Sequence, residues 1–240
     1  MVDLADIWRA GDGELHVWRL DVAAAPVREL LPLLDVEERA RAAKFVFVRH
    51  HDEFVAVRGW LRRLLGAYLD RDPAGLRFLY GTQGKPELAE DVAAMRFNVS
   101  HSDGWALLAF GAGVEIGVDV EAVREPDDFR DLAHECFSPA EMEAFSAVEF
   151  EHRAEFFYRL WTAKEAYTKA LGGGLSIPLR EVTIDVRDPA GPWPVLTTDE
   201  RADAWVVRPV RVCATHAGAV ATSGDSRRLL IFDVGDAPVW

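Results

Sequence analysis

The sequence has very little cysteine, and this limits the chemistry that could stabilise it. Among its 240 residues only Cys136 and Cys213 occur, far apart and outside any pattern of paired zinc ligands. Neither a disulfide framework nor a structural zinc is therefore indicated. We expect both side chains to be ordinary reduced thiols.

Basic residues are also scarce, and long apolar runs are missing. With 27 Lys and Arg against 40 Asp and Glu, the net charge of −13 argues against nonspecific nucleic-acid binding. An anionic ligand would need a local basic pocket. The longest apolar stretches, such as 105–110, are too short to span a bilayer, and the N-terminus lacks a basic region followed by an apolar run. We expect a cytoplasmic protein with no membrane partner.

Repeats and low-complexity tracts are absent as well, so organisation must come from ordinary helices and strands. Half of the residues are hydrophobic, which suits one large domain or two closely packed small ones. Periodicity predicts an early strand at 14–22, helices at 37–48 and 51–69, and three strands within 96–121. The motif GAGVEIG at 111–117 departs from the G-x-G-x-x-G spacing of dinucleotide sites, and we interpret it as a hairpin turn.

The last strand of this block carries two carboxylates. Asp119 and Glu121 alternate with apolar residues, so period two places both on one face. Like charges at that range repel unless a cation lies between them, and all-oxygen ligands favour Mg²⁺. Gly117 leaves room on that face for something to approach. The alternative is an ordinary solvated sheet face.

A helix with one glutamate among lysines is predicted at 159–175, and the glycines at 172–174 end it. One side of this helix carries Trp161, Lys164, Glu165, Thr168 and Lys169. If Glu165 only pairs with Lys169 on the surface, the pair contributes roughly 0.2–0.5 kcal/mol. Otherwise Glu165 belongs to a site.

Four further residues are ambiguous on their own. Ser100 and His101 suggest a hydrolase, but adjacent strand residues point to opposite faces and no G-x-S-x-G elbow is present. The same pair is suited to binding phosphate oxygens. Arg58 borders an apolar helix stripe, where it either covers the stripe or contacts an anion. Lys85 projects from a turn built of glycine and proline.

The second half has its own local signals. Ser138, Pro139 and Glu141 form a capping box at a helix start, within a helical region at 126–150. Strands are predicted in 182–186, 204–212, 216–223 and 227–234. His216 lies in one of them and has no visible partner.

Four short motifs occur in an order that resembles one family, the Sfp-type 4′-phosphopantetheinyl transferases. They are GKP at 84–86, NVSHS at 98–102, GVDVE at 117–121 and WTAKEAYTKALGGGL at 161–175, with IPL after the last. The resemblance extends more loosely over residues 35–180. It implies transfer of the 4′-phosphopantetheine arm of coenzyme A to a serine of an apo acyl or peptidyl carrier protein, with release of adenosine 3′,5′-bisphosphate.

The resemblance also implies residue roles. Asp119, Glu121 and Glu165 correspond to Mg²⁺ ligands, with Glu165 also the candidate base and Lys169 a further catalytic residue. The positions implied to hold coenzyme A are Arg58 at the nucleotide end, with Lys85, Ser100, His101, Lys164 and Lys169 at the phosphates. Glu37 and Glu38 depart from the basic residues that relatives carry near 37–44.

The family's fold is α+β, with two similar halves related by a pseudo-twofold and the active site in the cleft between them. Here the halves are expected at 1–113, contributing to coenzyme A binding, and 114–240, carrying the Mg²⁺ and catalytic residues. A monomer is expected. Two other functions stay open: a coenzyme A- or nucleotide-binding homologue without activity, and a hydrolase that uses Ser100 and His101.

Overall fold

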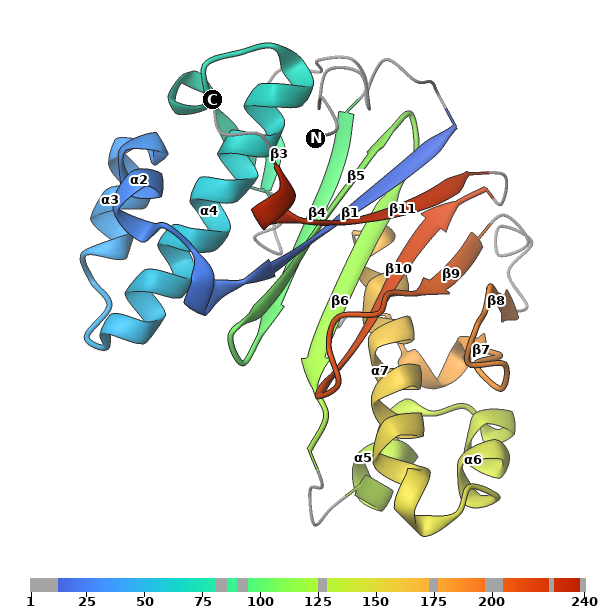
Figure 1. Ribbon diagram of the computed structural model, residues 1–240. Coiled ribbons are helices and arrows are strands. Elements are labelled where there is room, and N and C mark those ends of the chain that lie inside the picture. Colours follow the sequence, from blue (N-terminus) through green and yellow to red (C-terminus); the bar gives the residue numbers. More distant parts are fainter. Residues whose placement is uncertain are drawn as a thin grey trace.

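Two β-sheets face each other in a computed structural model of the protein, and one long helix covers the outer side of each (Figure 1). The structure describes residues 13–80, 86–89, 95–124, 129–172, 177–196, 205–224 and 227–237. Helices and strands are mixed along the chain, and the strand pairs are antiparallel apart from one. The α+β class predicted from the sequence is confirmed.

The first sheet has the strand order β11-β1-β5-β4. Its strands are β1 (Glu14–Asp21), β4 (Met95–Ser102), β5 (Trp105–Ala112) and β11 (Arg228–Asp233). Both β1 and β4 pair with β5 in antiparallel fashion, whereas β11 runs parallel to β1. A separate ribbon joins β2 (Phe78–Tyr80) and β3 (Pro86–Leu88).

The second sheet has the strand order β6-β10-β9-β8-β7. Its strands are β6 (Ile116–Ala122), β7 (Thr183–Ile184), β8 (Trp193–Leu196), β9 (Trp205–Pro209) and β10 (His216–Ser223). Because β6 pairs with β10 and belongs to a different sheet from β5, the interpretation of GAGVEIG as a hairpin turn is wrong. Gly113, with a φ of 61°, instead turns the chain from one sheet into the other, in a conformation that glycine adopts without steric cost.

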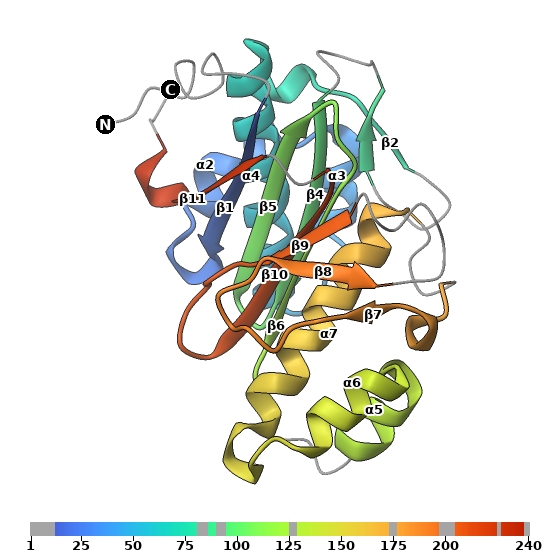
Figure 2. The same cartoon turned by 90° about the vertical axis from the view of Figure 1, so that its right-hand side faces the viewer.

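This crossing coincides with the predicted boundary between 1–113 and 114–240, which stays a prediction. The end of the chain crosses back over this boundary, because β11 lies beside β1 in the first sheet (Figure 2). The last strand therefore joins the two halves.

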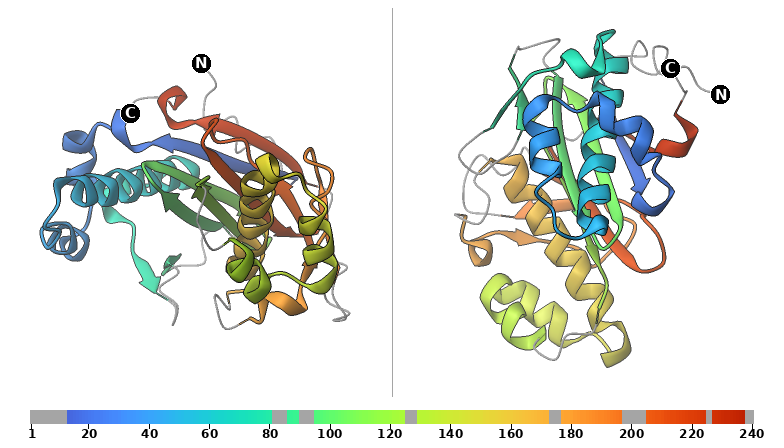
Figure 3. Two further views of the ribbon diagram at one scale, coloured as in Figure 1. Left: turned by 90° about the horizontal axis from the view of Figure 1, so that it is seen from below. Right: turned by 90° about the vertical axis from the view of Figure 1, so that its left-hand side faces the viewer.

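Helices cover both outer faces of the sheet pair (Figure 3). They are α2 (Val27–Leu30), α3 (Val36–Ala42), α4 (Val48–Leu69), α5 (Phe129–Cys136), α6 (Pro139–Ser146) and α7 (Arg153–Ala170). Short 3₁₀ helices are η1 (Val22–Ala24), η2 (Leu31–Leu33), η3 (Pro73–Gly75), η4 (Phe150–His152), η6 (Leu179–Glu181) and η8 (Val234–Asp236). In the described part of the chain, no helix has the length and apolar character needed to cross a membrane.

The predicted helix at 37–48 is too long. Helix α3 ends at Ala42, and α4 begins only at Val48. Between them Phe45 turns inward, with its ring 5.6 Å from that of Phe54. Aromatic and β-branched residues are weak helix formers. The helical tendency of this segment is therefore low, and the contact between Phe45 and Phe54 is enough to end the helix.

The other predicted helices agree better with the structure, although α7 begins at Arg153, before the predicted start at residue 159. Helix α4 contains the predicted 51–69, and the capping box of Ser138 and Glu141 is present at the start of α6. Helix α7 ends at Ala170, and Gly172 follows in the left-handed conformation. The other two glycines of that run lie outside the described residues.

Three apolar clusters hold the layers together. One packs α4 on the first sheet, and another packs α7 on the second. The third lies between the sheets and consists of Leu15, Val17, Leu107, Ala109, Ile116, Val118, Val120, Val210, Val212 and Val220. Alternation along β6 thus buries Ile116, Val118 and Val120 between the sheets, so the residues between them face α7.

Strand β4 and strand β6 meet along the seam between the two sheets. The side chain of Asn98 accepts a hydrogen bond from the backbone of Val118 at 2.9 Å, and that of Ser102 accepts one from Ala122 at 3.3 Å. Helix α7 crosses over β6 at Gly117, where a Cβ atom would come within 2.1 Å of the Ala166 carbonyl oxygen. The room that Gly117 leaves is therefore taken by the backbone of α7.

Candidate active site

The seam brings together polar side chains from three elements. Strand β6 contributes Asp119 and Glu121, helix α7 contributes Glu165 and Lys169, and strand β4 contributes the hydroxyls of Ser100 and Ser102. On β6 the two acids face α7 because the alternate residues fill the space between the sheets. On α7, Glu165 and Lys169 are one turn apart and so point the same way. We call these six residues the seam cluster.

Asp119 lies at the centre of the seam cluster and is only 2% exposed. Its Oδ1 atom accepts hydrogen bonds from the Ser100 hydroxyl at 2.8 Å and from the Lys169 ammonium at 2.6 Å. Lys169 also donates to the Ser100 hydroxyl at 2.9 Å. The Oδ2 atom is buried and has no hydrogen-bond partner among the described residues. Burial raises the pKa of Asp119, and the Lys169 charge opposes that rise.

Glu165 is in a similar electrostatic position. Its Oε1 atom is buried and likewise lacks a hydrogen-bond partner in the described part of the chain. Burial raises the pKa of Glu165, the negative charge of Asp119 adds to the rise, and Lys169 opposes it. A solvated surface ion pair does not have these properties, because the ammonium of Lys169 is held at Asp119 and Ser100 on the neighbouring strands.

Glu121 is held by a residue that the sequence reasoning missed. Its Oε2 atom accepts a hydrogen bond from the Ser102 hydroxyl at 2.8 Å. Burial raises the pKa of Glu121, Ser102 opposes the rise, and the charge of Asp119 adds to it. The signal was present in NVSHS, because period two places Ser102 on the same face of β4 as Ser100.

The seam cluster can accept a hard cation. Three carboxylates share one seam with a single lysine, and two of their buried oxygens are without hydrogen-bond donors. Within the described residues, no three acidic, histidine or cysteine side chains form a closed metal-binding group. Mg²⁺ does not require one, since it commonly takes one or two carboxylates and completes its octahedron with water and phosphate oxygens. The donor set fits such an ion.

His101 and Arg58 lie apart from the seam cluster. The His101 side chain is 54% exposed, and its Nδ1 lies 3.1 Å from a carboxylate oxygen of Glu53 on α4. The guanidinium of Arg58, also on α4, lies over the rings of Phe78 and Tyr80. Lys85 lies outside the described residues.

This arrangement argues against the hydrolase alternative. The Ser100 hydroxyl donates to Asp119, whereas His101 contacts Glu53 on another element. A serine nucleophile needs its base within hydrogen-bond reach. The pair is therefore not a catalytic dyad in this structure.

Lys164 does not join the seam cluster either, and its expected contact with coenzyme A needs correction. The side chain is completely buried. Its ammonium donates to the carbonyl oxygens of Leu179 and Val182 at 2.6 and 2.5 Å and pairs with Glu141 at 2.7 Å. An ammonium has three hydrogens, and these three partners can use all of them. Lys164 is thus a structural residue of the second half.

Comparison with known proteins gives matches over both halves. A sequence model of the 4′-phosphopantetheinyl transferase superfamily matches residues 115–221, and one of the N-terminal region of a 4′-phosphopantetheinyl transferase matches residues 23–112. The two matches meet close to the crossing between the sheets.

Individual relatives bear the same description. The 4′-phosphopantetheinyl transferase HetI of Nostoc sp. strain PCC 7120 is 37% identical over 215 residues, which is 88% of each chain. AcpT of Escherichia coli K12, also a 4′-phosphopantetheinyl transferase, is 41% identical over 117 residues, covering 48% of this chain and 57% of its own. A mouse L-aminoadipate-semialdehyde dehydrogenase-phosphopantetheinyl transferase is 31% identical, over 62% of this chain and 52% of its own.

Proposed function

The chain belongs to the 4′-phosphopantetheinyl transferase superfamily and transfers the phosphopantetheine group of coenzyme A to carrier proteins; we propose that the seam cluster is its active site. The observation that carries this proposal is that two buried carboxylate oxygens in one seam, Asp119 Oδ2 and Glu165 Oε1, lack hydrogen-bond donors among the described residues. A buried acceptor without a donor costs free energy, so such a pair is expected where a ligand supplies the missing partner. Glu38 Oε1 also lacks a hydrogen bond, but it lies 3.7 Å from the guanidinium of Arg58.

Mg²⁺ is the proposed ligand of these oxygens, with Asp119, Glu121 and Glu165 as its protein ligands. When bound, the ion would polarise the pyrophosphate of coenzyme A and offset the charge of the leaving group. The hydrogen bond from Ser102 fixes the carboxylate of Glu121 in place. In the same way Ser100 and Lys169 fix one oxygen of Asp119 and leave the other available.

Glu165 is proposed as the base. The carrier's serine hydroxyl attacks the phosphorus that bears the pantetheine arm, the bond to adenosine 3′,5′-bisphosphate breaks, and Glu165 takes the serine proton. A raised pKa makes the carboxylate a stronger base, because burial and the neighbouring negative charges favour its protonated form. The nucleophile belongs to the partner, which agrees with the absence of a serine–histidine dyad at Ser100 and His101.

Lys169 and the residues near α4 are proposed to hold coenzyme A. Lys169 already lies between Ser100 and Asp119, where its charge can balance phosphate oxygens. Arg58 is proposed to contact the nucleotide end, and His101 and Lys85 to contact the phosphates. The half-exposed position of His101 supports this role, because a ligand can reach its imidazole without displacing the core.

A direct assay tests the site. The protein is incubated with coenzyme A, MgCl₂ and a panel of apo acyl and peptidyl carrier proteins, and each carrier is followed by intact mass. We expect a gain of one phosphopantetheine that disappears with EDTA. Asp119→Asn should lower the rate by about 10²-fold or more at every Mg²⁺ concentration, a range typical of a lost electrostatic catalyst.

Asp103→Asn is the matched control, because Asp103 is exposed on the turn between β4 and β5 and asparagine tolerates its positive φ. It should transfer like the wild type. Binding of coenzyme A without any transfer to the panel would favour the inactive homologue instead. Wild-type rates for Asp119→Asn would remove the seam cluster as the site.

We also propose that the protein works as a monomer in the cytoplasm. Every member of the seam cluster comes from one chain, so no second copy is needed to complete it. Sedimentation equilibrium tests the oligomeric state, and a transfer rate proportional to protein concentration is the expected kinetic counterpart. A specific activity that rises with concentration would contradict it.

A further inference from the structure

Cys213, Thr215 and His216 form a small polar group at the start of β10, outside the seam cluster. The Cys213 sulfur lies 3.3 Å from Nδ1 of His216, and the Thr215 hydroxyl lies 3.0 Å from the same nitrogen. On the other side of the ring, Nε2 lies 3.2 Å from the backbone carbonyl oxygen of Ser102. The structure thus gives His216 partners that the sequence did not show.

The carbonyl of Ser102 determines how the imidazole is protonated. A carbonyl oxygen only accepts hydrogen bonds, so Nε2 must carry a hydrogen and donate it. In the neutral ring Nδ1 is then an acceptor, and it faces the sulfur of Cys213. A thiol, a base within hydrogen-bond reach and a third group that orients the base are the three parts of an activated nucleophile.

The thiol is also accessible. Cys213 and His216 are both partly exposed, and Thr215 is exposed. Cys136, the other cysteine, offers an internal comparison. Burial raises the pKa of Cys136, and the neighbouring charge of Glu135 adds to the rise. Cys136 therefore lies where its thiolate is disfavoured, whereas the sulfur of Cys213 has an imidazole nitrogen within hydrogen-bond distance.

We propose that Cys213 is a reactive thiol, activated by His216, that forms mixed disulfides with small disulfides. The proton of Cys213 passes to Nδ1 of His216, and the thiolate sulfur attacks one sulfur of the reagent. A new S–S bond forms, the S–S bond of the reagent breaks, and its other half leaves as a thiolate. Cys213 is oxidised, and half of the reagent is reduced.

The expected rate advantage is limited by the chemistry of thiols. An unperturbed cysteine is already a few per cent thiolate near neutral pH, so complete ionisation can raise the reactive fraction by a few tens of fold. Lower basicity makes the thiolate a somewhat weaker nucleophile. We therefore expect Cys213 to react about 10-fold faster than Cys136.

The test uses glutathione disulfide as the probe on the whole, folded protein. Intact mass follows adduct formation, and peptide mapping assigns it to Cys213 or Cys136. His216→Asn should slow the reaction of Cys213 by about 10-fold and leave the rate of Cys136 unchanged. Thr215→Val is the control for local disturbance, because it removes the hydroxyl that contacts both the Cys213 sulfur and Nδ1 of His216 but leaves the base; it should not slow Cys213.

Each other result overturns the proposal. Equal rates for the two cysteines would show that Cys213 is not activated. An unchanged Cys213 rate in His216→Asn would show that the imidazole is not its base. An equal fall in His216→Asn and Thr215→Val would attribute the reactivity to the polar contacts of the turn as a whole rather than to the imidazole as base. The Cys136 rate reports whether a variant has lost its fold.

Discussion

Each half of the protein buries one cation on its long helix, Arg62 on α4 and Lys164 on α7. Each pairs with the glutamate of a helix capping box, Glu38 at the start of α3 and Glu141 at the start of α6. Each also donates to two backbone carbonyls of a segment that follows its helix. The same arrangement of a buried cation and a capping-box glutamate thus occurs once in each half, which supports the prediction that the two halves are similar.

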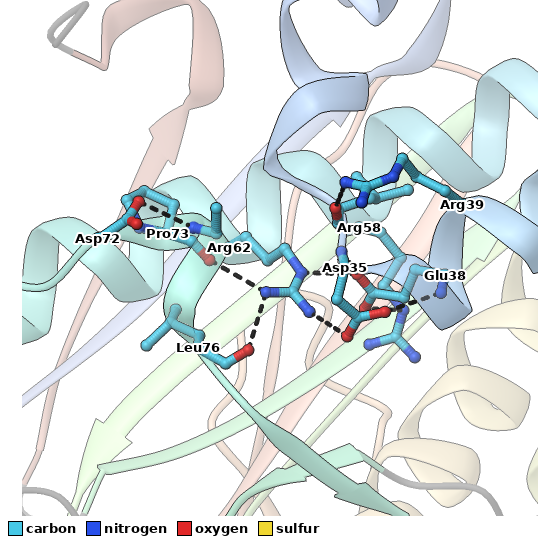
Figure 4. A network of polar contacts seen from close by, with 10 residues as sticks. Asp35, Glu38, Arg39, Arg58, Arg62, Asp72, Pro73 and Leu76 are labelled. Carbon is cyan, nitrogen blue, oxygen red and sulfur yellow. Dashed lines mark hydrogen bonds and ion pairs between the residues drawn. The ribbon is translucent and has the colours of Figure 1, made fainter.

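The two arrangements differ in the number of acceptors. Arg62 donates to Glu38 and Asp35 at 2.6 Å each and to the carbonyls of Pro73 and Leu76 at 3.0 and 2.9 Å (Figure 4). Lys164 has only one carboxylate, Glu141, and two carbonyls. A guanidinium has five donor hydrogens and an ammonium has three, so each cation suits the acceptors around it.

The seam cluster shows the opposite balance. There one ammonium, that of Lys169, lies among three carboxylates, and two buried oxygens are without donors in the described structure. Around Lys164 every hydrogen of the ammonium has an acceptor. The two lysines on α7 therefore differ in their surroundings: the ammonium of Lys164 is fully paired inside the second half, whereas Lys169 is one cation among three carboxylates, which supports the role proposed for the seam cluster.

The largest stability effect is expected in the first half. Arg62→Met leaves two carboxylates and two carbonyls without their donor, and breaking such a buried pair costs about 3–5 kcal/mol. Urea unfolding measures the loss. The control is Arg63→Met, because Arg63 is only partly buried and its cation–π contact with Trp60 contributes about 0.5–1 kcal/mol. Equal losses for the two variants would contradict the comparison.

Lys164→Met should cause the next largest loss of unfolding free energy, toward the lower end of the same range, because it leaves one carboxylate without its donor rather than two. Its transfer rate per folded molecule should stay near that of the wild type. Lys169→Met should do the reverse, losing transfer with a smaller change in melting temperature, since its side chain is partly exposed. Weaker coenzyme A binding by folded Lys164→Met would return Lys164 to the binding site.

Glu165→Gln addresses the seam cluster. The amide keeps the shape but removes the charge and the basicity, so single-turnover transfer should fall by about 10²-fold, a loss of about 2.7 kcal/mol in transition-state stabilisation. Coenzyme A binding and the melting temperature should change little.

Glu155→Gln makes the same substitution on the exposed part of α7 and should transfer normally. A rate for Glu165→Gln within threefold of the wild type would mean that Glu165 is not the base for transfer.

The smallest effect concerns pH. The pKa of Glu165 is raised in the folded protein, so between its unfolded value of about 4 and the higher folded value the native state holds a proton that the unfolded chain has released. Glu165 therefore makes the protein less stable as pH rises through that window. In EDTA, the free energy of unfolding of the wild type should fall with pH relative to Glu165→Gln. A parallel pair of curves would contradict the raised pKa.

Local patterns were enough to predict much of the fold. Alternation identified β1, β4, β5 and β6, and the 3.6-residue period identified α4 and α7, because these periods depend only on backbone geometry. The capping box at Ser138 could be predicted for the same reason, because its hydrogen bonds join residues only three positions apart. The helix predicted at 37–48 instead ends early, at Ala42, because the packing of Phe45 on Phe54 is a contact between elements that no local pattern shows.

The sequence by itself determined which side chains of the seam cluster share a face. Period two places Asp119 and Glu121 on one face of a strand, and i+4 spacing aligns Glu165 with Lys169 on a helix. Tertiary structure alone decided which lysine of α7 meets them. The sequence pattern does not distinguish Lys164 from Lys169. In the structure Lys164 pairs with Glu141 inside the second half, whereas Lys169 contacts side chains on β4 and β6. Their partners lie on elements far away in sequence, and only packing brings those elements together.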